Sequence, residues 1–286
     1  MRVDMVILNV WIDSTSSHYA SAVQDFLNFC KEQGIPFLSA VPASEDILSL
    51  YAASMAGILV GCMAANKILG QIRRNRINGP LRISYTLRGT ENLRPPNSVR
   101  AQRCAMTRQM LHIIYENLDM TTALDTCIWA IILTAFWSQI RLGECLPKRQ
   151  SVVNPKLIPS WRNFACPNDM GSRTLHLPHT KRGKMKGETA IITRQHGSLD
   201  PIHARMNEAH AGDAIAVYKG PKNTRIALVT RKLLKRINPI LENASYPTIS
   251  GHCFCIGGTT ALLLDGVPPD IVKLLSRWSS DSFLRY

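Results

Sequence analysis

Residues 251–286 read GHCFCIGGTTALLLDGVPPDIVKLLSRWSSDSFLRY and contain two short helical patterns. The first covers Thr259–Leu264 and the second covers Asp270–Leu275, because apolar residues recur in both at helical spacing. Gly266 and two prolines separate them, and these residue types interrupt a helix. His252 lies before the first helical segment, where the closing stretch begins, and an isolated histidine near a helix start is more often structural than catalytic.

The sequence between residue 107 and this stretch predicts helices combined with a small sheet. Apolar residues predict helices over 107–118 and 121–138, the second of which is apolar enough to be buried. Two strands, over 174–178 and 187–193, flank a turn rich in Lys and Gly. This pattern predicts a mainly helical α+β domain with a small antiparallel sheet. We also expect a helix over 200–209, a strand over 213–218 and a basic helix over 225–242.

The first part of the chain reads as helices only, followed by a linker. Helical spacing of apolar residues recurs over 19–30, 47–55 and 63–78. The stretch that follows is rich in Pro and Arg and only weakly periodic, which is typical of a linker between domains. We therefore predict a helical domain over 1–80, a basic linker over 81–106 and a second domain over 107–286.

The formal net charge of +14 is concentrated in two stretches of the chain. Residues 73–108 contain nine Lys or Arg and one acid, and residues 171–243 contain fourteen against five, so they contribute +8 and +9. The rest of the chain sums to −3. This arrangement favours two surfaces that face a polyanion, although a solvated basic surface without a ligand has the same composition.

The composition argues against several other classes of protein. The longest apolar stretch, Ala123–Trp137, contains Asp125 and has the length of a core helix, so no membrane span is expected. The N-terminus has an acid and a short apolar run, which argues against a signal peptide and for a soluble intracellular protein. The eight cysteines are scattered without a C-x-x-C pair, so neither a disulfide framework nor a metal site is expected.

Several polar residues are candidates for chemistry on a phosphate. Arg141 follows the buried helix, and Glu144 could orient its guanidinium as a phosphate-binding fork. Lys181 lies in the turn of the predicted hairpin, where a flexible ammonium can reach into a groove. Trp278 has an indole N–H donor, and Tyr286 has a phenol that needs nearby cations to favour phenolate. Each residue alone also has an ordinary explanation: a structural ion pair, a solvated turn, a core tryptophan or an inert phenol.

The order of these residues and the text around them resemble the tyrosine recombinase (phage integrase) superfamily. The segments FWSQIRLGE, LHLPHTK and the closing stretch are similar to the transposon-borne recombinases of fungal genomes. The resemblance extends from about residue 15 to the end of the chain. It implies an all-α core-binding (SAM-like) domain over 1–80 and an integrase-like catalytic domain over 107–286. The residues that follow the order of the family's catalytic signature are Arg141, Lys181, His252, Trp278 and Tyr286.

The resemblance implies DNA strand transfer without a metal, ATP or any other cofactor. Tyr286 would attack the scissile phosphate to give a 3′-phosphotyrosine and a free 5′-hydroxyl. Arg141 would stabilise the charged phosphate together with the arginine that the family has at position 255. Lys181 would protonate the leaving 5′-oxygen, and His252 would assist proton transfer. Trp278 would donate a hydrogen bond to a phosphate oxygen.

Three features depart from the family's pattern. Cys255 replaces the second arginine, and because a thiol cannot neutralise a phosphoryl oxygen we predict strong impairment. Trp278 and Tyr286 are eight residues apart, where many bacterial relatives have one residue more, which rotates a helical side chain by about 100°. The chain ends at Tyr286, where relatives continue into a further helix, so we interpret the second domain as C-terminally truncated. Cys255 as a nucleophile paired with His252 is an alternative, but no third orienting group is evident.

We therefore predict a DNA-binding protein of tyrosine recombinase type that cuts and rejoins DNA, as in DNA integration by a mobile element. The expected partner is double-stranded DNA, with no membrane and no small-molecule substrate, and a homo-oligomer on DNA is compatible with this reading. The expected location is the nucleus in a eukaryote and otherwise the nucleoid. The alternatives are a catalytically dead DNA-binding remnant of a mobile element and a basic globular protein without a nucleic-acid role. The residues expected to contact DNA are Arg73, Arg74, Arg76, Arg94, Arg100, Arg103, Arg182, Lys184 and Lys186.

Overall fold

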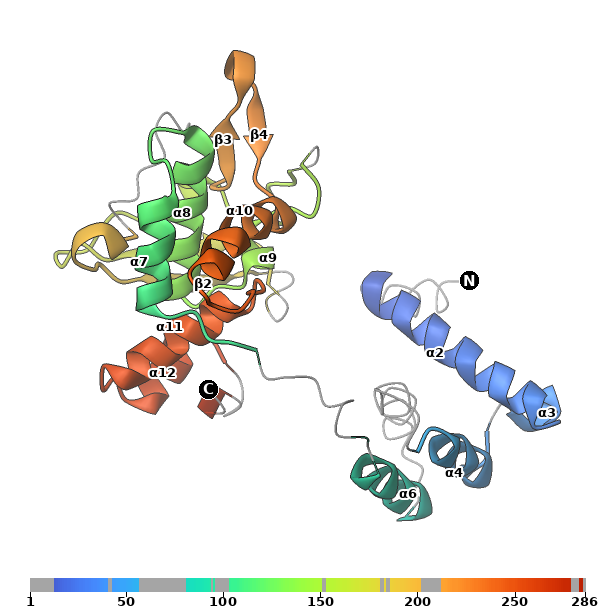
Figure 1. Cartoon of the computed structure of the whole chain (residues 1–286). Helices are drawn as coiled ribbons and strands as arrows, with labels where there is room; N and C mark the ends of the chain where they lie inside the picture. The colour runs from blue at the N-terminus through green and yellow to red at the C-terminus, as the bar shows by residue number, and fades with distance from the viewer. Residues whose placement is uncertain are drawn as a thin grey trace. The chain divides into compact units, whose positions relative to one another are not determined.

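The computed structural model describes residues 13–40, 43–56, 81–93, 95, 103–150, 153–180, 183, 186–201, 212–278 and 283–284. Over these residues the chain is mainly helical, with two small antiparallel sheets (Figure 1). It divides into two compact units, Met1–Ala101 and Gln102–Tyr286, and each contains a hydrophobic core of its own. Among the described helices, none is both long enough and apolar enough to cross a membrane.

The first unit is built from helices. They are α2 (Asp13–Glu32), α3 (Phe37–Ala40), α4 (Glu45–Ser54) and α6 (Leu81–Asn92). The predicted helices over 19–30 and 47–55 are confirmed as parts of α2 and α4, whereas the one predicted over 63–78 lies outside the described residues. Ser44 begins α4, because its hydroxyl oxygen accepts a hydrogen bond from the N–H of Ile47.

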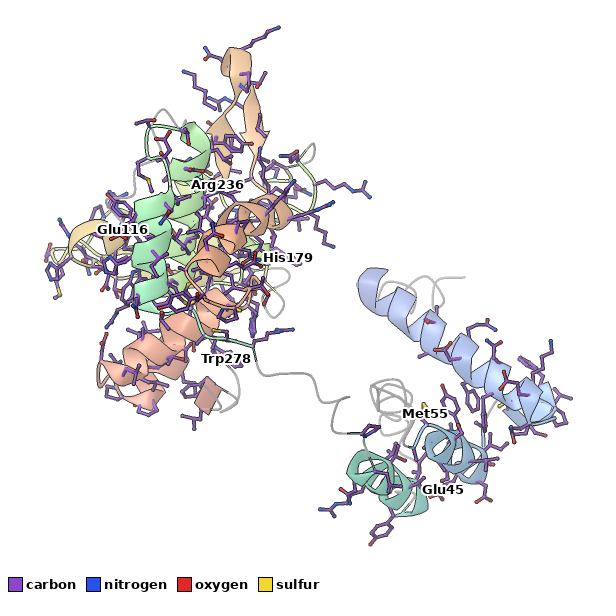
Figure 2. The ribbon with its side chains drawn as sticks, in the orientation of Figure 1. Glu45, Met55, Glu116, His179, Arg236 and Trp278 are labelled. Carbon is purple, nitrogen blue, oxygen red and sulfur yellow. The ribbon has the colours of Figure 1, made fainter. Side chains whose placement is uncertain are left out.

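Helix α6 corrects the linker prediction, which was wrong for residues 81–92. Ile83 on α6 is buried in the core of the first unit, and its N–H donates to Oε1 of Glu45 at 3.0 Å. Glu45, at the start of α4, is labelled in Figure 2. The hydroxyl of Thr90 donates to the carbonyl oxygen of Ala52 on α4 at 3.3 Å. Because the apolar side of this helix is narrow, its stability depends on packing against α4, which the local sequence does not reveal.

The second unit combines helices with two hairpins. Its helices are α7 (Arg108–Asn117), α8 (Ala123–Trp137), α9 (Leu142–Cys145), α10 (Thr230–Asn243), α11 (Cys253–Leu264) and α12 (Pro269–Leu275). Short 3₁₀ turns cover Trp161–Asn163, Gly197–Leu199 and Pro221–Asn223. The first hairpin pairs β1 (Arg173–Leu177) with β2 (Glu188–Ile192), and the second pairs β3 (Val217–Lys219) with β4 (Arg225–Ala227).

Most of the elements predicted for this unit are confirmed. The helices over 107–118 and 121–138 are α7 and α8, and the strands over 174–178 and 187–193 are β1 and β2. The helix predicted over 225–242 was wrong at its start, because Arg225–Ala227 pairs with β3 and α10 begins at Thr230. Helix α11 begins at Cys253, earlier than predicted, and residues 202–209 of another predicted helix lie outside the described residues.

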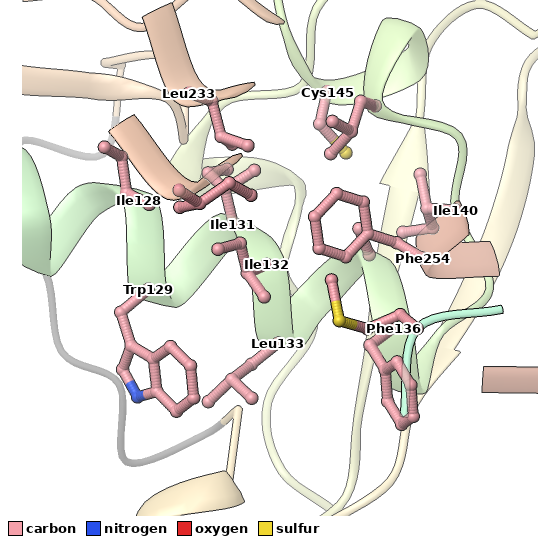
Figure 3. Packing of buried hydrophobic residues seen from close by; sticks show 14 of the residues in the cluster. Ile128, Trp129, Ile131, Ile132, Leu133, Phe136, Ile140, Cys145, Leu233 and Phe254 are labelled. Carbon is pink, nitrogen blue, oxygen red and sulfur yellow. The ribbon is translucent and has the colours of Figure 1, made fainter. Parts of the chain in front are cut away.

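Helix α8 forms the centre of the larger core. It is buried from Cys127 to Trp137, and the side chains of Ile128, Ile132 and Phe136 are fully enclosed (Figure 3). Phe254 on α11 belongs to the same cluster. A helix that is apolar on every side is stable only when other elements surround it, and α8 therefore organises the unit.

Two adjacent glycines allow α11 to approach its neighbours closely. A Cβ atom added to Gly258 would lie 1.8 Å from the carbonyl oxygen of Phe136 at the end of α8. A Cβ atom added to Gly257 would lie 2.1 Å from the carbonyl oxygen of Met106. The backbone of Met106 also donates to the carbonyl oxygen of Cys253 at 3.1 Å. This close packing places the start of α11 beside the end of α8.

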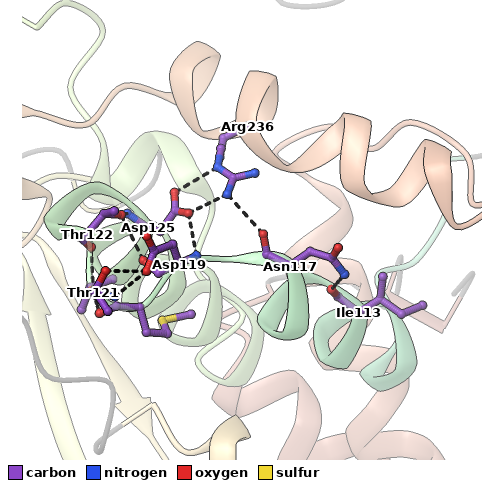
Figure 4. Close-up of polar contacts among 9 residues, drawn as sticks. Ile113, Asn117, Asp119, Thr121, Thr122, Asp125 and Arg236 are labelled. Atoms are coloured by element: carbon purple, nitrogen blue, oxygen red, sulfur yellow. Dashed lines mark hydrogen bonds and ion pairs between the residues drawn. The ribbon is translucent and has the colours of Figure 1, made fainter.

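A buried carboxylate joins α10 to the turn between α7 and α8. Arg236 donates from Nε to Oδ1 of Asp125 at 3.0 Å, and from Nη2 to Oδ2 at 2.6 Å (Figure 4). The same Nη2 donates to the carbonyl oxygen of Asn117 at 3.2 Å, and Asp125 also accepts the N–H of Asp119 at 2.9 Å. Because every one of these contacts satisfies a polar atom at the turn, the network fixes the start of α8.

Candidate functional site

Arg141 and Glu144 lie where α8 ends and α9 begins. Glu144 accepts the backbone N–H of Arg141 at 3.2 Å through Oε2, and it accepts Nη1 of Arg141 at 3.0 Å through Oε1. The Glu144 side chain is 7% exposed, whereas the Arg141 side chain is 45% exposed. The buried carboxylate therefore orients the guanidinium, and the exposed part of the Arg141 side chain can meet an anion from solvent.

His252 and Cys255 lie at the start of α11. The Sγ atom of Cys255 is 3.1 Å from Nδ1 of His252 and 3.1 Å from the carbonyl oxygen of the same residue. The turn before α11 packs on α9, because a Cβ atom added to Gly251 would lie 3.2 Å from Cδ1 of Leu142. His252 and Arg141, far apart in sequence, therefore lie in the same part of the second unit. We call the site formed by Arg141, Glu144, His252 and Cys255 the corner.

Burial, and to a smaller extent the nearby charges, shift two pKa values at this site. Burial raises the pKa of the Cys255 thiol to about 11, while the Arg141 charge opposes the rise and Glu144 adds to it. Burial lowers the pKa of His252, and the positive charges of Arg103 and Arg141 lower it further. Near neutral pH the pair is therefore a thiol and an uncharged imidazole, and not the thiolate and imidazolium of an activated cysteine nucleophile.

Arg277 is part of this corner and was not among the residues singled out from the sequence. Its side chain is 10% exposed, and Nη2 donates to Oε2 of Glu144 at 3.0 Å. Its Nε lies 3.7 Å from Oε2 of Glu188 at the start of β2. No local pattern reveals this arginine, because its partners lie far away in the sequence.

The first hairpin presents its turn next to Glu188. Thr180 holds the base of the turn, since its hydroxyl oxygen accepts the N–H of Gly183 at 2.8 Å. His179 precedes this turn (Figure 2). Lys181, the predicted proton donor, follows Thr180 in the sequence and lies outside the described residues.

Of the other residues predicted from the sequence, some lie within the described part of the chain and some lie outside it. Trp278 is partly buried and packs against the small cluster of Leu262, Val272 and Phe283 (Figure 2). It follows Arg277 directly, so it lies next to the corner through the chain. Arg103 and Lys186 are exposed. The predicted residues outside the described part of the chain are Tyr286, Arg73, Arg74, Arg76, Arg94, Arg100, Arg182 and Lys184.

The structure thus brings Arg141, Glu144, His252 and Cys255 together. Within the described residues, no group of three or more His, Cys, Asp or Glu side chains is arranged to hold a metal ion. The arrangement offers an exposed guanidinium, a neutral imidazole and a neutral thiol beside them. Such a set suits binding of an anion and transfer of a proton.

Comparison with known proteins provides no family assignment. No protein-family model matches the chain, and no curated protein matches it in sequence. One solved structure with a similar chain is titled "Crystal structure of XerA recombinase". That match has 13% sequence identity and a TM-score of 0.39, and it covers 99% of this chain and 90% of the other. The similarity is too low to assign a family, so function is inferred from the side chains.

Proposed function

We propose that this protein binds double-stranded DNA and has a phosphoryl-transfer site of tyrosine recombinase type, weakened by Cys255. One observation carries the proposal: the buried Glu144 orients Arg141, and the charge of Arg141 helps to lower the pKa of the His252 imidazole. Nucleophilic substitution at a phosphate requires a positive group that stabilises the charged oxygens and a base that accepts a proton. A half-exposed, oriented arginine and a neutral histidine can supply these two functions. The order of the remaining residues in the sequence supports the same reaction class.

In the proposed reaction the Tyr286 phenol attacks the scissile phosphorus. A bond forms between the phenolic oxygen and phosphorus, and the bond from phosphorus to the 5′-oxygen breaks. Arg141 holds a non-bridging oxygen and balances its growing charge. The neutral imidazole of His252 can accept the phenolic proton, and Lys181 gives a proton to the leaving 5′-oxygen. Trp278 donates from its indole N–H to a phosphate oxygen.

Cys255 limits the rate of this reaction. Its thiol is buried and uncharged near neutral pH, so it provides no positive charge to the phosphate. Loss of one preorganised donor typically lowers the rate of the chemical step by about 10²–10³-fold. The same observation favours a second candidate function, in which the chain is a DNA-binding module without catalytic activity.

Binding to DNA is supported by basic side chains on the second hairpin and on α10. The exposed residues there are Lys219, Lys222, Arg225, Arg231 and Lys235, and Arg225 is paired with Asp213. Phosphate contacts by such residues would make the affinity fall steeply as the salt concentration rises. We extend the proposal to the basic residues predicted from the sequence, to a role in a mobile element and to the nucleus or nucleoid as the location.

The test is covalent trapping on nicked duplexes taken from the DNA that flanks the gene. The proteins to compare are the chain itself, Cys255→Arg, and Cys255→Arg combined with Tyr286→Phe. We expect a covalent protein–DNA adduct with Cys255→Arg, at least about 10²-fold less with the chain itself, and none when the phenol is also removed. Salt-sensitive DNA binding without an adduct from any variant would favour the inactive binding module. Equal affinity for DNA and for a neutral polymer would refute both functions.

A further inference from the structure

Arg277 combines an unfavourable backbone with a buried charge. Its φ angle is 58°, in the left-handed region that a residue with a Cβ atom rarely adopts. Its guanidinium is nine-tenths buried, which is costly for a charge unless partners compensate it. Glycine would suit this backbone better, so the presence of arginine points to a role for the side chain.

The guanidinium joins three segments that the proposed reaction uses. It donates to Glu144 beside Arg141, and it faces Glu188, where the hairpin with Lys181 begins its second strand. Its own backbone leads directly into Trp278. A single side chain thus connects segments that are distant in the sequence at the point where the reaction needs them aligned.

Arg277 also contributes to the charge next to Arg141. Two guanidinium groups, Arg141 and Arg277, face two carboxylates, Glu144 and Glu188, and these four charges sum to zero. Without Arg277 the remaining three sum to −1. Oxygen Oε2 of Glu144 would then lose a charged donor, and the Arg141 fork could turn inward to bind both carboxylate oxygens.

We propose that Arg277 is a positioning residue that occupies Glu144, so that the outer edge of Arg141 stays directed at the DNA phosphate. This inference rests on the proposed function. In this proposal Arg277 supports the positive charge that Arg141 presents to the phosphate, a charge that an arginine at position 255 would also supply. The guanidinium of Arg277 itself is too buried to meet the phosphate, so it acts through Glu144 and Arg141.

The test compares Arg277→Gly and Arg277→Lys in the Cys255→Arg background. Glycine relieves the left-handed backbone while removing the guanidinium, so loss of function cannot be attributed to backbone strain. We expect Arg277→Gly to lower the rate of adduct formation per folded molecule by about 10²-fold, with DNA affinity changed by less than about threefold. Lysine should restore part of the rate. Adding Glu188→Gln to Arg277→Gly should also restore part of the rate, because it removes one of the two carboxylates that the lost guanidinium faces.

A matched control is Arg236→Gln, which breaks an ion pair with a buried carboxylate away from the site. It should lower stability and leave the rate per folded molecule unchanged. An unchanged rate in Arg277→Gly, or an equal loss in Arg236→Gln, would overturn the inference.

A second readout separates this inference from the proposed function. Arg103 and Arg141 lower the pKa of His252, so inward rotation of Arg141 should raise the pKa measured by NMR in Arg277→Gly. This measurement uses the chain with its native Cys255 and no DNA. If Cys255→Arg gives no adduct but the His252 pKa rises, the proposed reaction fails and the positioning role stands. If the His252 pKa does not move, the positioning role fails.

Discussion

The thiol of Cys255 is expected to react slowly with alkylating reagents, with a steep dependence on pH. It is 2% exposed, and burial raises its pKa to about 11. Only the thiolate reacts, so the rate follows the thiolate fraction. The alternative in which Cys255 is a nucleophile activated by His252 requires the opposite, a thiolate near neutral pH.

The expected magnitude follows from this pKa. At pH 7.5 a thiol with a pKa of about 11 is about 0.03% thiolate, and one with the ordinary pKa of about 8.5 is about 9% thiolate. The pKa alone therefore predicts a rate about 300-fold lower than that of an ordinary thiol. Between pH 7.5 and 9.5 the thiolate fraction rises about 100-fold for Cys255, against about 10-fold for the ordinary thiol.

The assay is labelling by iodoacetamide, followed at each cysteine by peptide mass spectrometry between pH 6.5 and 9.5. Cys166 is exposed and is the reference within the same molecule. Shielding of Cys255 from the reagent lowers the rate equally at every pH, so the slope against pH isolates the pKa. Labelling of Cys255 as fast as Cys166 at pH 7.5, with a shallow slope, would refute the reasoning and restore the nucleophile alternative.

Three further predictions concern the frame of the site. Gly258→Ala should lower the free energy of unfolding, measured by urea denaturation, by about 2 kcal/mol or more, because its Cβ would lie 1.8 Å from a carbonyl oxygen. Gly143→Ala is the control: its Cβ would meet no atom within 4 Å, so the same measurement should show little change. Arg236→Gln should lower the free energy of unfolding by about 2 kcal/mol, because it leaves the buried Asp125 carboxylate without its charge partner. The loss is smaller than for a fully buried pair, because the Arg236 side chain is about one-third exposed. A thermal-unfolding temperature equal to that of the parent protein would contradict this. The folded state lowers the pKa of His252, so protonation of this residue favours unfolding. Its contribution to stability is complete above about pH 6.5 and is lost as the pH falls through the lowered pKa. His252→Gln should therefore make the fall in stability at acid pH less steep, and an unchanged pH profile would disprove this.

The local sequence predicted the elements of the second unit because their cause is local. Apolar spacing is sufficient to indicate α7 and α8, and alternation around a Gly-rich turn is sufficient to indicate β1 and β2. The prediction failed where packing decides. Helix α6 has a narrow apolar side and forms against α4, and Arg225–Ala227 pairs with β3 although the residues around it resemble a basic helix.

The residue types alone indicate which side chains can bind a phosphate and in what order they occur along the chain. The glycine at position 258 likewise allows α11 to approach α8, because only glycine leaves room for the carbonyl oxygen beside it. Which of these charges meet depends instead on how the helices pack. Arg277 contacts Glu144 because helix packing brings two distant segments together, and the energy of an ion pair depends on distance in space and on burial rather than on sequence separation.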